Sequence, residues 1–221
     1  MDFQPIVKTS AQINADAESF LSTYHPALSI PVPIEEIIEL NLKIDVIPIP
    51  GLKDIAEAAG LNIDAFIGSD FKSISIDKYI SEHVETRYRF SLSHEIGHMV
   101  LHGYLYNHMK FNTTDEWVSL INEMSEYERD VVEYQANEFA GLILAPKQVL
   151  VAELEKVIAE NEIRFKDSLT GRKQLSRASV LDLAMYPLSL KFKVSENVIR
   201  IRSVEIGDSD RFPAKIFTFY S

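Results

Sequence analysis

Two histidines with a glutamate between them form the most informative string in the chain, His94-Glu95-Ile96-Gly97-His98. On a helix, residues i and i+4 lie one turn apart on the same face, so both imidazoles can reach one metal ion. Glu95 lies about 100° around the helix from His94 and can approach the same site without being a ligand. A water-activating zinc site requires such a set, because the metal acidifies the water and the carboxylate accepts its proton. We therefore predict His94 and His98 as metal ligands and Glu95 as the general base.

A catalytic zinc site has three protein ligands and one open position, so a third ligand must come from elsewhere in the chain. His102 lies eight residues after His94, about 12 Å along the helix axis, and the two cannot share one ion. Packing, or a hydrogen bond that supports a ligand, is the expected role of His102. A third histidine six residues after the second is excluded, because Tyr104 occupies that position.

The predicted third ligand is Glu133. Glu133, Ala136, Asn137 and Ala140 follow i, i+3, i+4, i+7 spacing and share one stripe of a helix. The small residues let this helix approach the histidine helix closely, as a carboxylate–zinc bond of about 2 Å requires. Asn137 is placed to accept a hydrogen bond from the ring nitrogen of a histidine ligand that does not bind the metal. Glu138 points elsewhere and is the weaker choice; the alternative for Glu133 itself is an ordinary solvated carboxylate.

Hydrophobic periodicity predicts the elements that must hold these residues. The histidine helix is expected to begin at Ser81 as its N-cap and to stop at Gly103. The aromatic-rich residues 104–124 are expected to form a loop with about one turn of helix. The other expected elements are helices at 12–24, 34–40, 125–144, 146–161, 178–192 and 196–206, and strands at 44–49, 62–67 and 71–77 with a turn at 68–70 between the last two. Residues 164–177 are polar and expected to be mobile, and an extended tail is expected after Gly207.

Composition limits the classes of function. The chain has 221 residues, a formal charge of −11 and no cysteine, which excludes disulfides and thiolate metal sites. The acidic balance disfavours nucleic-acid binding, which needs clustered Lys and Arg. No apolar run reaches the roughly 18 residues of a membrane span. The N-terminus lacks the features of a signal peptide, so a cytoplasmic location without membrane contact is expected.

Three stretches of the sequence resemble one family, the ImmA/IrrE-type metallopeptidases of bacteria and their mobile elements. The first stretch is residues 89–102, RFSLSHEIGHMVLH; the second is residues 133–140, EYQANEFA, continuing to Leu144-Ala145-Pro146. The third and weaker one is Val32-Pro33-Ile34 with the strand pair that precedes the histidine helix. With the phrase at 192–196, FKVSE, the resemblance covers about residues 28–207. Ser93 and Ala145 stand where relatives more often have Ala and Met, and both changes look harmless.

The resemblance implies an α+β, zincin-like fold with a small sheet of about three strands, in which the histidine helix packs on the glutamate helix. It implies His94, His98 and Glu133 as ligands of one Zn²⁺, with Mn²⁺ or another divalent ion as a substitute, and Glu95 as the base. It also implies a task, because members of this family cut or inactivate helix-turn-helix repressors and so release genes of mobile elements or stress responses.

The segment between the two ligand helices is expected to form a wall or lid of the substrate cleft. Tyr104 and Tyr106 in this segment, and Tyr134 beside Glu133, are candidate donors to the oxyanion that develops during acyl transfer. The alternative for each tyrosine is an ordinary core or interface position.

Two domains are expected: a metallopeptidase domain at 1–162 and a helical, helix-turn-helix-like appendage with an extended tail at 163–221. The appendage is expected to pack or to grip a partner rather than to contact DNA. The leading hypothesis is a zinc endopeptidase that cleaves a repressor. The alternatives are a non-proteolytic regulator that binds the repressor and a partner in a toxin–antitoxin pair.

Overall fold

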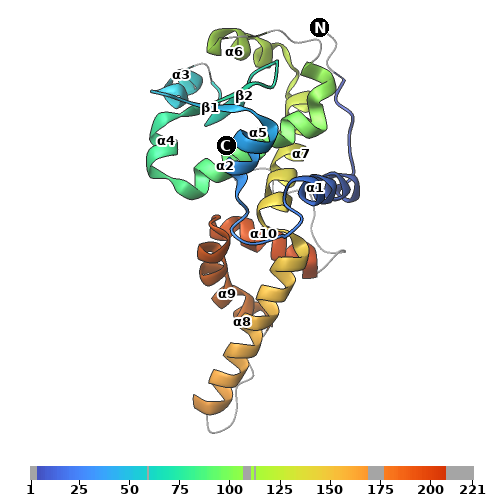
Figure 1. The fold of residues 1–221 in the computed structure, drawn as a ribbon, viewed down its shortest axis with the longest axis vertical. Helices are drawn as coiled ribbons and strands as arrows, with labels where there is room; N and C mark the ends of the chain where they lie inside the picture. The colour runs from blue at the N-terminus through green and yellow to red at the C-terminus, as the bar shows by residue number, and fades with distance from the viewer. Residues whose placement is uncertain (1–3, 59, 107–110, 112, 169–176, 208–221) are drawn as a thin grey trace.

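The structure is a computed structural model that describes residues 4–58, 60–106, 111, 113–168 and 177–207. Most of it is helical, and a small sheet lies at the end of the molecule that carries α3, α4 and α6 (Figure 1). α8 and α9 form the opposite, narrower end. The elements run in the order α1 (Ser10–Tyr24), α2 (Ile34–Glu36), η1 (Ile37–Leu42), β1 (Asp45–Ile49), α3 (Leu52–Ala58), β2 (Ala65–Ile67), β3 (Ser73–Asp77), α4 (Lys78–His83), α5 (Glu85–Tyr106), α6 (Thr114–Glu123), α7 (Glu126–Leu144), α8 (Lys147–Ser168), α9 (Arg177–Phe192) and α10 (Glu196–Gly207).

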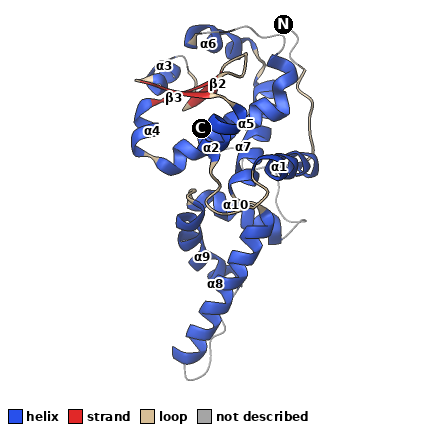
Figure 2. Ribbon diagram, viewed as in Figure 1, coloured by secondary structure: helices blue, strands red, loops and turns tan. Residues whose placement is uncertain are grey.

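The three strands form one mixed sheet in the order β1-β3-β2. β1 runs parallel to β3 with Val46 opposite Ile74, and β2 runs antiparallel to β3 with Ile67 opposite the same residue. The predicted turn between β2 and β3 is confirmed, because the Gly68 N–H donates to the Ser73 carbonyl at 2.8 Å. Figure 2 shows this sheet among the helices, and the predicted α+β fold with a small three-stranded sheet is confirmed.

The core is built around the pairing of α5 with α7. Leu92 and Ile96 on α5 and Phe139 and Ile143 on α7 are all fully buried in one hydrophobic cluster. α1 covers another side of α7, where the rings of Phe20 and Phe139 meet edge to face with centroids 5.8 Å apart. These hydrophobic contacts hold α7 against α5 without any contribution from the polar groups of the site.

The predicted start of the histidine helix at Ser81 is wrong. The Asp77 side chain at the end of β3 accepts from the backbone N–H groups of Tyr79 and Ile80 and so caps the short helix α4. The backbone leaves the helical region at Val84, with φ −130° and ψ 71°, and α5 begins directly afterwards. Ser81 lies inside α4, where its hydroxyl donates to the Lys78 carbonyl.

Two further boundaries differ from the prediction. α5 continues past Gly103 to Tyr106, because Leu105 is buried in a second hydrophobic cluster. Where a loop with about one turn was expected, α6 has ten residues. Thr113 and Glu116 form a capping box at its start, and Trp117 stacks on Phe66 with ring centroids 5.2 Å apart. The Thr-x-x-Glu spacing at 113–116 is the sequence signal that was missed.

The remaining helices follow the prediction closely, except that α8 extends to Ser168 instead of 161. β2 is shorter than predicted, since Asp64 before it lies in a bend and pairs with Arg87. The expected extended tail at 208–221 and residues 169–176 of the expected mobile stretch lie outside the described residues. In the part of the chain that is described, no helix is long and apolar enough to cross a membrane.

One buried side chain of α5 joins distant parts of the chain. The Arg89 guanidinium donates through Nη2 to the Val32 carbonyl at 2.7 Å and through Nε to the Lys193 carbonyl at 3.2 Å. The main hydrophobic cluster likewise contains Leu92 of α5 together with Phe192 and Ile199 of the C-terminal helices. The division into domains at residue 162 stays a prediction, and the core extends across that position.

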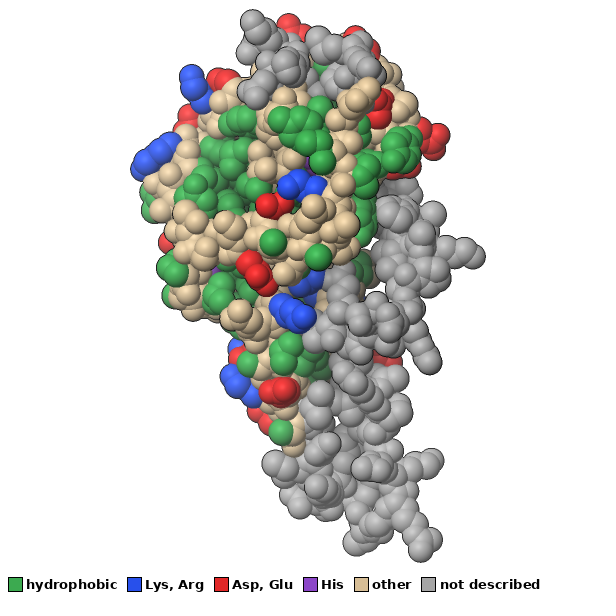
Figure 3. Space-filling view, turned by 90° about the vertical axis from the view of Figure 1, so that its right-hand side faces the viewer, with side chains coloured by type: hydrophobic (Ala, Val, Ile, Leu, Met, Phe, Trp, Pro, Cys, Tyr) green, Lys and Arg blue, Asp and Glu red, His purple; other side chains and the backbone are tan. Residues whose placement is uncertain are grey.

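Charged side chains of both signs lie interspersed over the described part of the face drawn in Figure 3. Ion pairs join exposed charges at the C-terminal helices, such as Lys193 with Glu85 at 2.6 Å and Arg200 with Asp182 at 2.7 Å.

Candidate metal centre

α5 brings two histidine rings together on one face, as their spacing predicts. The Nε2 atoms of His94 and His98 lie 2.9 Å apart, and the ring planes are inclined at 80°. Both side chains are mostly buried, with 15% and 10% of their surface exposed. Two ring nitrogens therefore point at one place in the interface between α5 and α7.

Glu133 on α7 completes this arrangement. Its Oε2 lies 3.2 Å from His94 Nε2, and its Oε1 lies 3.4 Å from His98 Nε2. Ligand atoms about 2.0–2.1 Å from a tetrahedral zinc ion are themselves about 3.3 Å apart. The two histidine–carboxylate distances match this value, and the distance between the two histidine nitrogens is shorter, at 2.9 Å. Two nitrogens and a carboxylate that converge in this way fit a zinc site.

Glu95 lies beside the two histidines and is buried. Ligand atoms of His94, Glu95 and His98 all lie within 4.8 Å of one another. The backbone N–H of Ile67 in β2 donates to Glu95 Oε2 at 2.8 Å, which fixes the orientation of the carboxylate. Burial raises the pKa of Glu95, while the neighbouring histidines act in the opposite direction. This contact with β2 has no sequence signal, because it depends on how the sheet meets α5.

The close approach of α5 to α7 occurs at Gly97, between the two histidines. A Cβ atom at position 97 would lie 3.0 Å from both the Cα and the carbonyl oxygen of Ala136, which is itself fully buried. Ala136 is one turn from Glu133. The glycine and the alanine therefore set the helix separation at which the Glu133 carboxylate reaches the histidine nitrogens.

Each histidine is supported through its second ring nitrogen. Asn137 Oδ1 lies 2.9 Å from His94 Nδ1, in the place that its spacing from Glu133 predicts. Of the two roles expected for His102, the structure shows the hydrogen bond, because its Nδ1 lies 3.2 Å from His98 Nδ1. Each ring therefore has one polar side chain within hydrogen-bond distance of its Nδ1 atom.

The charges of the site are coupled. Burial lowers the pKa of His94, but the ion pair and hydrogen bond with Glu133 outweigh it and raise the pKa to about 9. Burial raises the pKa of Glu133, yet the two histidines hold it well below the ordinary 4.5. Burial lowers the pKa of His102 to about 3, so its ring is neutral. An anionic Glu133 and a neutral His102 are the forms that metal binding requires.

The three candidate oxyanion donors are placed differently. The Tyr104 hydroxyl accepts from the backbone N–H of Ile6 at 2.6 Å, and the Tyr134 hydroxyl lies 3.4 Å from the Ser10 hydroxyl. Burial raises the pKa of Tyr106 well above 10, and Glu95 and Glu133 raise it further.

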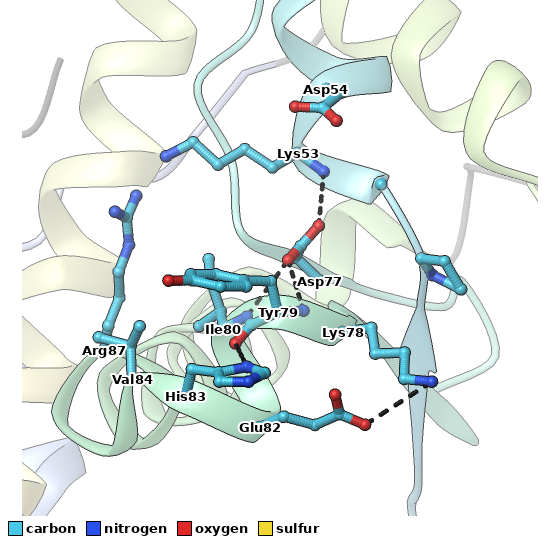
Figure 4. Close-up of a pocket in the computed structure, with 12 residues that line it drawn as sticks. Lys53, Asp54, Asp77, Lys78, Tyr79, Ile80, Glu82, His83, Val84 and Arg87 are labelled. Atoms are coloured by element: carbon cyan, nitrogen blue, oxygen red, sulfur yellow. Dashed lines mark hydrogen bonds and ion pairs between the residues drawn. The ribbon is translucent and has the colours of Figure 1, made fainter.

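A separate hollow of about 570 Å³ lies between α3 and the start of α5. Figure 4 shows its lining, in which Lys53 and Arg87 lie on one side and Lys78 pairs with Glu82 on the other. Both Lys53 and Arg87 pair with Asp64. None of the residues of the metal centre lines this hollow.

Residues 72–203, more than half of the chain, match the family model described as the IrrE N-terminal-like domain (Peptidase_M78). No curated protein matches the chain. The matched range contains His94, Glu95, His98 and Glu133.

The first prediction concerns the helix separation. Gly97→Ala should weaken zinc binding and lower the free energy of unfolding by about 1–3 kcal/mol, because the added methyl group meets the backbone of Ala136. Gly103→Ala on the same helix is the matched control, since its methyl group would meet only the Phe71 ring at 3.7 Å. Zinc titration and urea unfolding measure both effects. Zinc binding by Gly97→Ala as tight as that of the wild type would contradict this role of the glycine.

The second prediction concerns pH. In metal-stripped protein the pKa of His94 is about 9 in the folded state against 6.5 for the free side chain. The protonated His94 ring therefore contributes to the free energy of unfolding. This contribution is fully present below pH 6.5 and is lost as the pH rises through 9. We expect the Tm in EDTA to fall over this range. Glu133→Gln should remove most of that slope, because a neutral amide does not favour the charged imidazole. An unchanged slope in the variant would assign the pH dependence to other groups.

Proposed function

The chain belongs to the IrrE N-terminal-like domain family, a peptidase family, and from this membership we propose that it is a zinc-dependent endopeptidase that cleaves a helix-turn-helix transcriptional repressor. Family membership supports a metallopeptidase role. The observation that carries the finer proposal is the convergence of His94, His98 and Glu133, with the Glu95 carboxylate beside them.

The protein groups divide the chemistry between them. When bound, zinc supplies acidification of a water molecule and polarisation of the scissile carbonyl. Glu95 accepts the proton of the attacking water and then delivers it to the leaving amine. Burial raises the pKa of Glu95, and this suits both steps. A carboxylate with a higher pKa is a stronger base toward water, and its protonated form is better populated for proton delivery to the amine. Tyr106 is partly buried, and both carboxylates help to raise its pKa, so it is the preferred of the three tyrosines as oxyanion donor.

The sheet edge next to Glu95 favours an extended peptide as substrate. β2 is an edge strand, and its N–H groups at Phe66 and Gly68 face β3 in the antiparallel register. The backbone N–H groups of Ala65 and Ile67 therefore point away from β3, and that of Ile67 reaches Glu95. A peptide that adds to this edge as a strand would carry its backbone past the site.

The choice of a repressor as the substrate is supported by the family resemblance of the motifs at 89–102 and 133–146. Such a substrate places the reaction in the cytoplasm. An intracellular peptidase of this kind needs narrow specificity, and we expect recognition to depend on surfaces of the repressor outside the cleaved segment.

The third prediction separates metal binding from catalysis. Glu95→Gln keeps an oxygen to accept from the Ile67 N–H but removes the proton acceptor, so bound zinc should remain at about one per chain while turnover falls about 10²–10⁴-fold. His94→Ala and Glu133→Ala should lose zinc as well as activity. Elemental analysis and peptide-hydrolysis rates measure the two quantities. Wild-type turnover by Glu95→Gln would remove Glu95 as the base.

The fourth prediction tests the substrate. Incubation with the helix-turn-helix protein encoded beside its gene should give one defined pair of fragments by mass spectrometry, whereas casein should be cut poorly. The Glu95→Gln protein serves as the control for contaminating proteases. Rapid digestion of casein at low enzyme concentration would indicate a general protease, and binding of the repressor without any cleavage would favour the non-proteolytic alternative.

A further inference from the structure

A chain of buried polar groups leads from the metal centre to the N-terminal segment. It begins at His98, whose Nε2 faces Glu133 and whose Nδ1 lies 3.2 Å from His102 Nδ1. It ends where Gln135 Nε2 donates to the backbone carbonyl of Ile6 at 3.1 Å. His102 and Gln135 are each only 1% exposed. Both of them are polar groups that the proposed reaction does not use.

The direction of each hydrogen bond follows from His98. A histidine that binds a metal through Nε2 carries its proton on Nδ1 and donates it to a neighbouring acceptor. The acceptor here is His102 Nδ1, so that nitrogen is unprotonated and the His102 proton lies on Nε2. The Ile6 carbonyl fixes the amide of Gln135 in a similar way, because it takes the NH₂ group and leaves Oε1 directed elsewhere.

The two remaining atoms are complementary. His102 Nε2 and Gln135 Oε1 are both buried and lack a partner of strict hydrogen-bond geometry among the described residues. Under the assignments above, His102 Nε2 is a donor and Gln135 Oε1 is an acceptor. Gln135 also acts on the pKa of His102 as a hydrogen-bonding neighbour. An unpaired buried donor and acceptor would each be costly, so their pairing is favoured.

We infer that His102 and Gln135 are positioning residues that, together with the Ile6 carbonyl, orient His98 for metal binding. The inference rests on the proposed zinc site. In this arrangement the N-terminal segment at Ile6 helps to hold His98, although the two residues are far apart in sequence. The Tyr104 hydroxyl strengthens this attachment, since it accepts from the Ile6 N–H at 2.6 Å.

Zinc affinity of folded variants is the first test. His102→Leu removes the acceptor and should weaken zinc binding about 10–100-fold, as loss of a supporting partner does at other zinc sites. His102→Asn should restore most of the affinity, because its Oδ1 can take the place of the ring Nδ1. His83→Leu, at an exposed histidine of α4, is the matched control. Competition with a chromophoric chelator gives each dissociation constant, and thermal unfolding of the metal-free forms confirms folding.

The outcomes separate this inference from the proposed function. A wild-type protein that binds no zinc would overturn the metal site itself and the inference with it. A wild-type protein that binds zinc, with folded His102→Leu binding it equally well or with His102→Asn as weak as His102→Leu, would overturn the inference alone.

The tautomer of His102 is the second test. Long-range ¹H–¹⁵N NMR spectra of the zinc-loaded protein should show His102 protonated on Nε2 and His98 on Nδ1. Gln135→Met should weaken zinc binding several-fold and shift the His102 resonances, whereas Gln148→Met on the exposed surface of α8 should do neither. A His102 proton on Nδ1 in the wild type would overturn the proposed direction of the hydrogen bonds.

Discussion

The separation of α5 and α7 is the constraint on which the rest of the site depends. At Gly97 and Ala136 the two helices are so close that a Cβ atom at position 97 would lie 3.0 Å from the backbone of Ala136. This contact brings a carboxylate from one helix within 3.2–3.4 Å of two imidazoles on the other. Two mostly buried imidazoles and a half-buried carboxylate are costly to hold together out of water, and the hydrophobic residues on both sides of the contact supply the favourable free energy that offsets this cost.

Each functional side chain of α5 also has a polar partner that orients it. Asn137 on α7 lies against His94, His102 one turn along α5 lies against His98, and the backbone of β2 donates to Glu95. α7 therefore contributes both the Glu133 carboxylate and the partner of His94, so a displacement of this helix would disturb two parts of the site together.

The sequence predicts the relative positions of site side chains wherever they lie on one helix and depend only on its periodicity. The one-turn spacing of His94 and His98 and the stripe shared by Glu133 and Asn137 follow from helix geometry alone, and the structure places these side chains together. The contact of Ile67 with Glu95 and that of Gln135 with Ile6 could not be predicted, because each joins elements whose relative position depends on the whole fold. The missed start of α4 has a local cause, since Asp77 is both the last residue of β3 and the N-cap of the helix that follows.

Arg89 has a consequence for how the protein forms. The acceptors of its guanidinium are separated from it by 57 and 104 residues, one toward each end of the chain. Contacts between such distant residues form late in folding, because the loops they close are long. During synthesis, the histidine motif leaves the ribosome well before Lys193 does. The helix that carries the histidine motif therefore gains this buried contact only after Lys193 has been made, and a chain that stops before this residue lacks it.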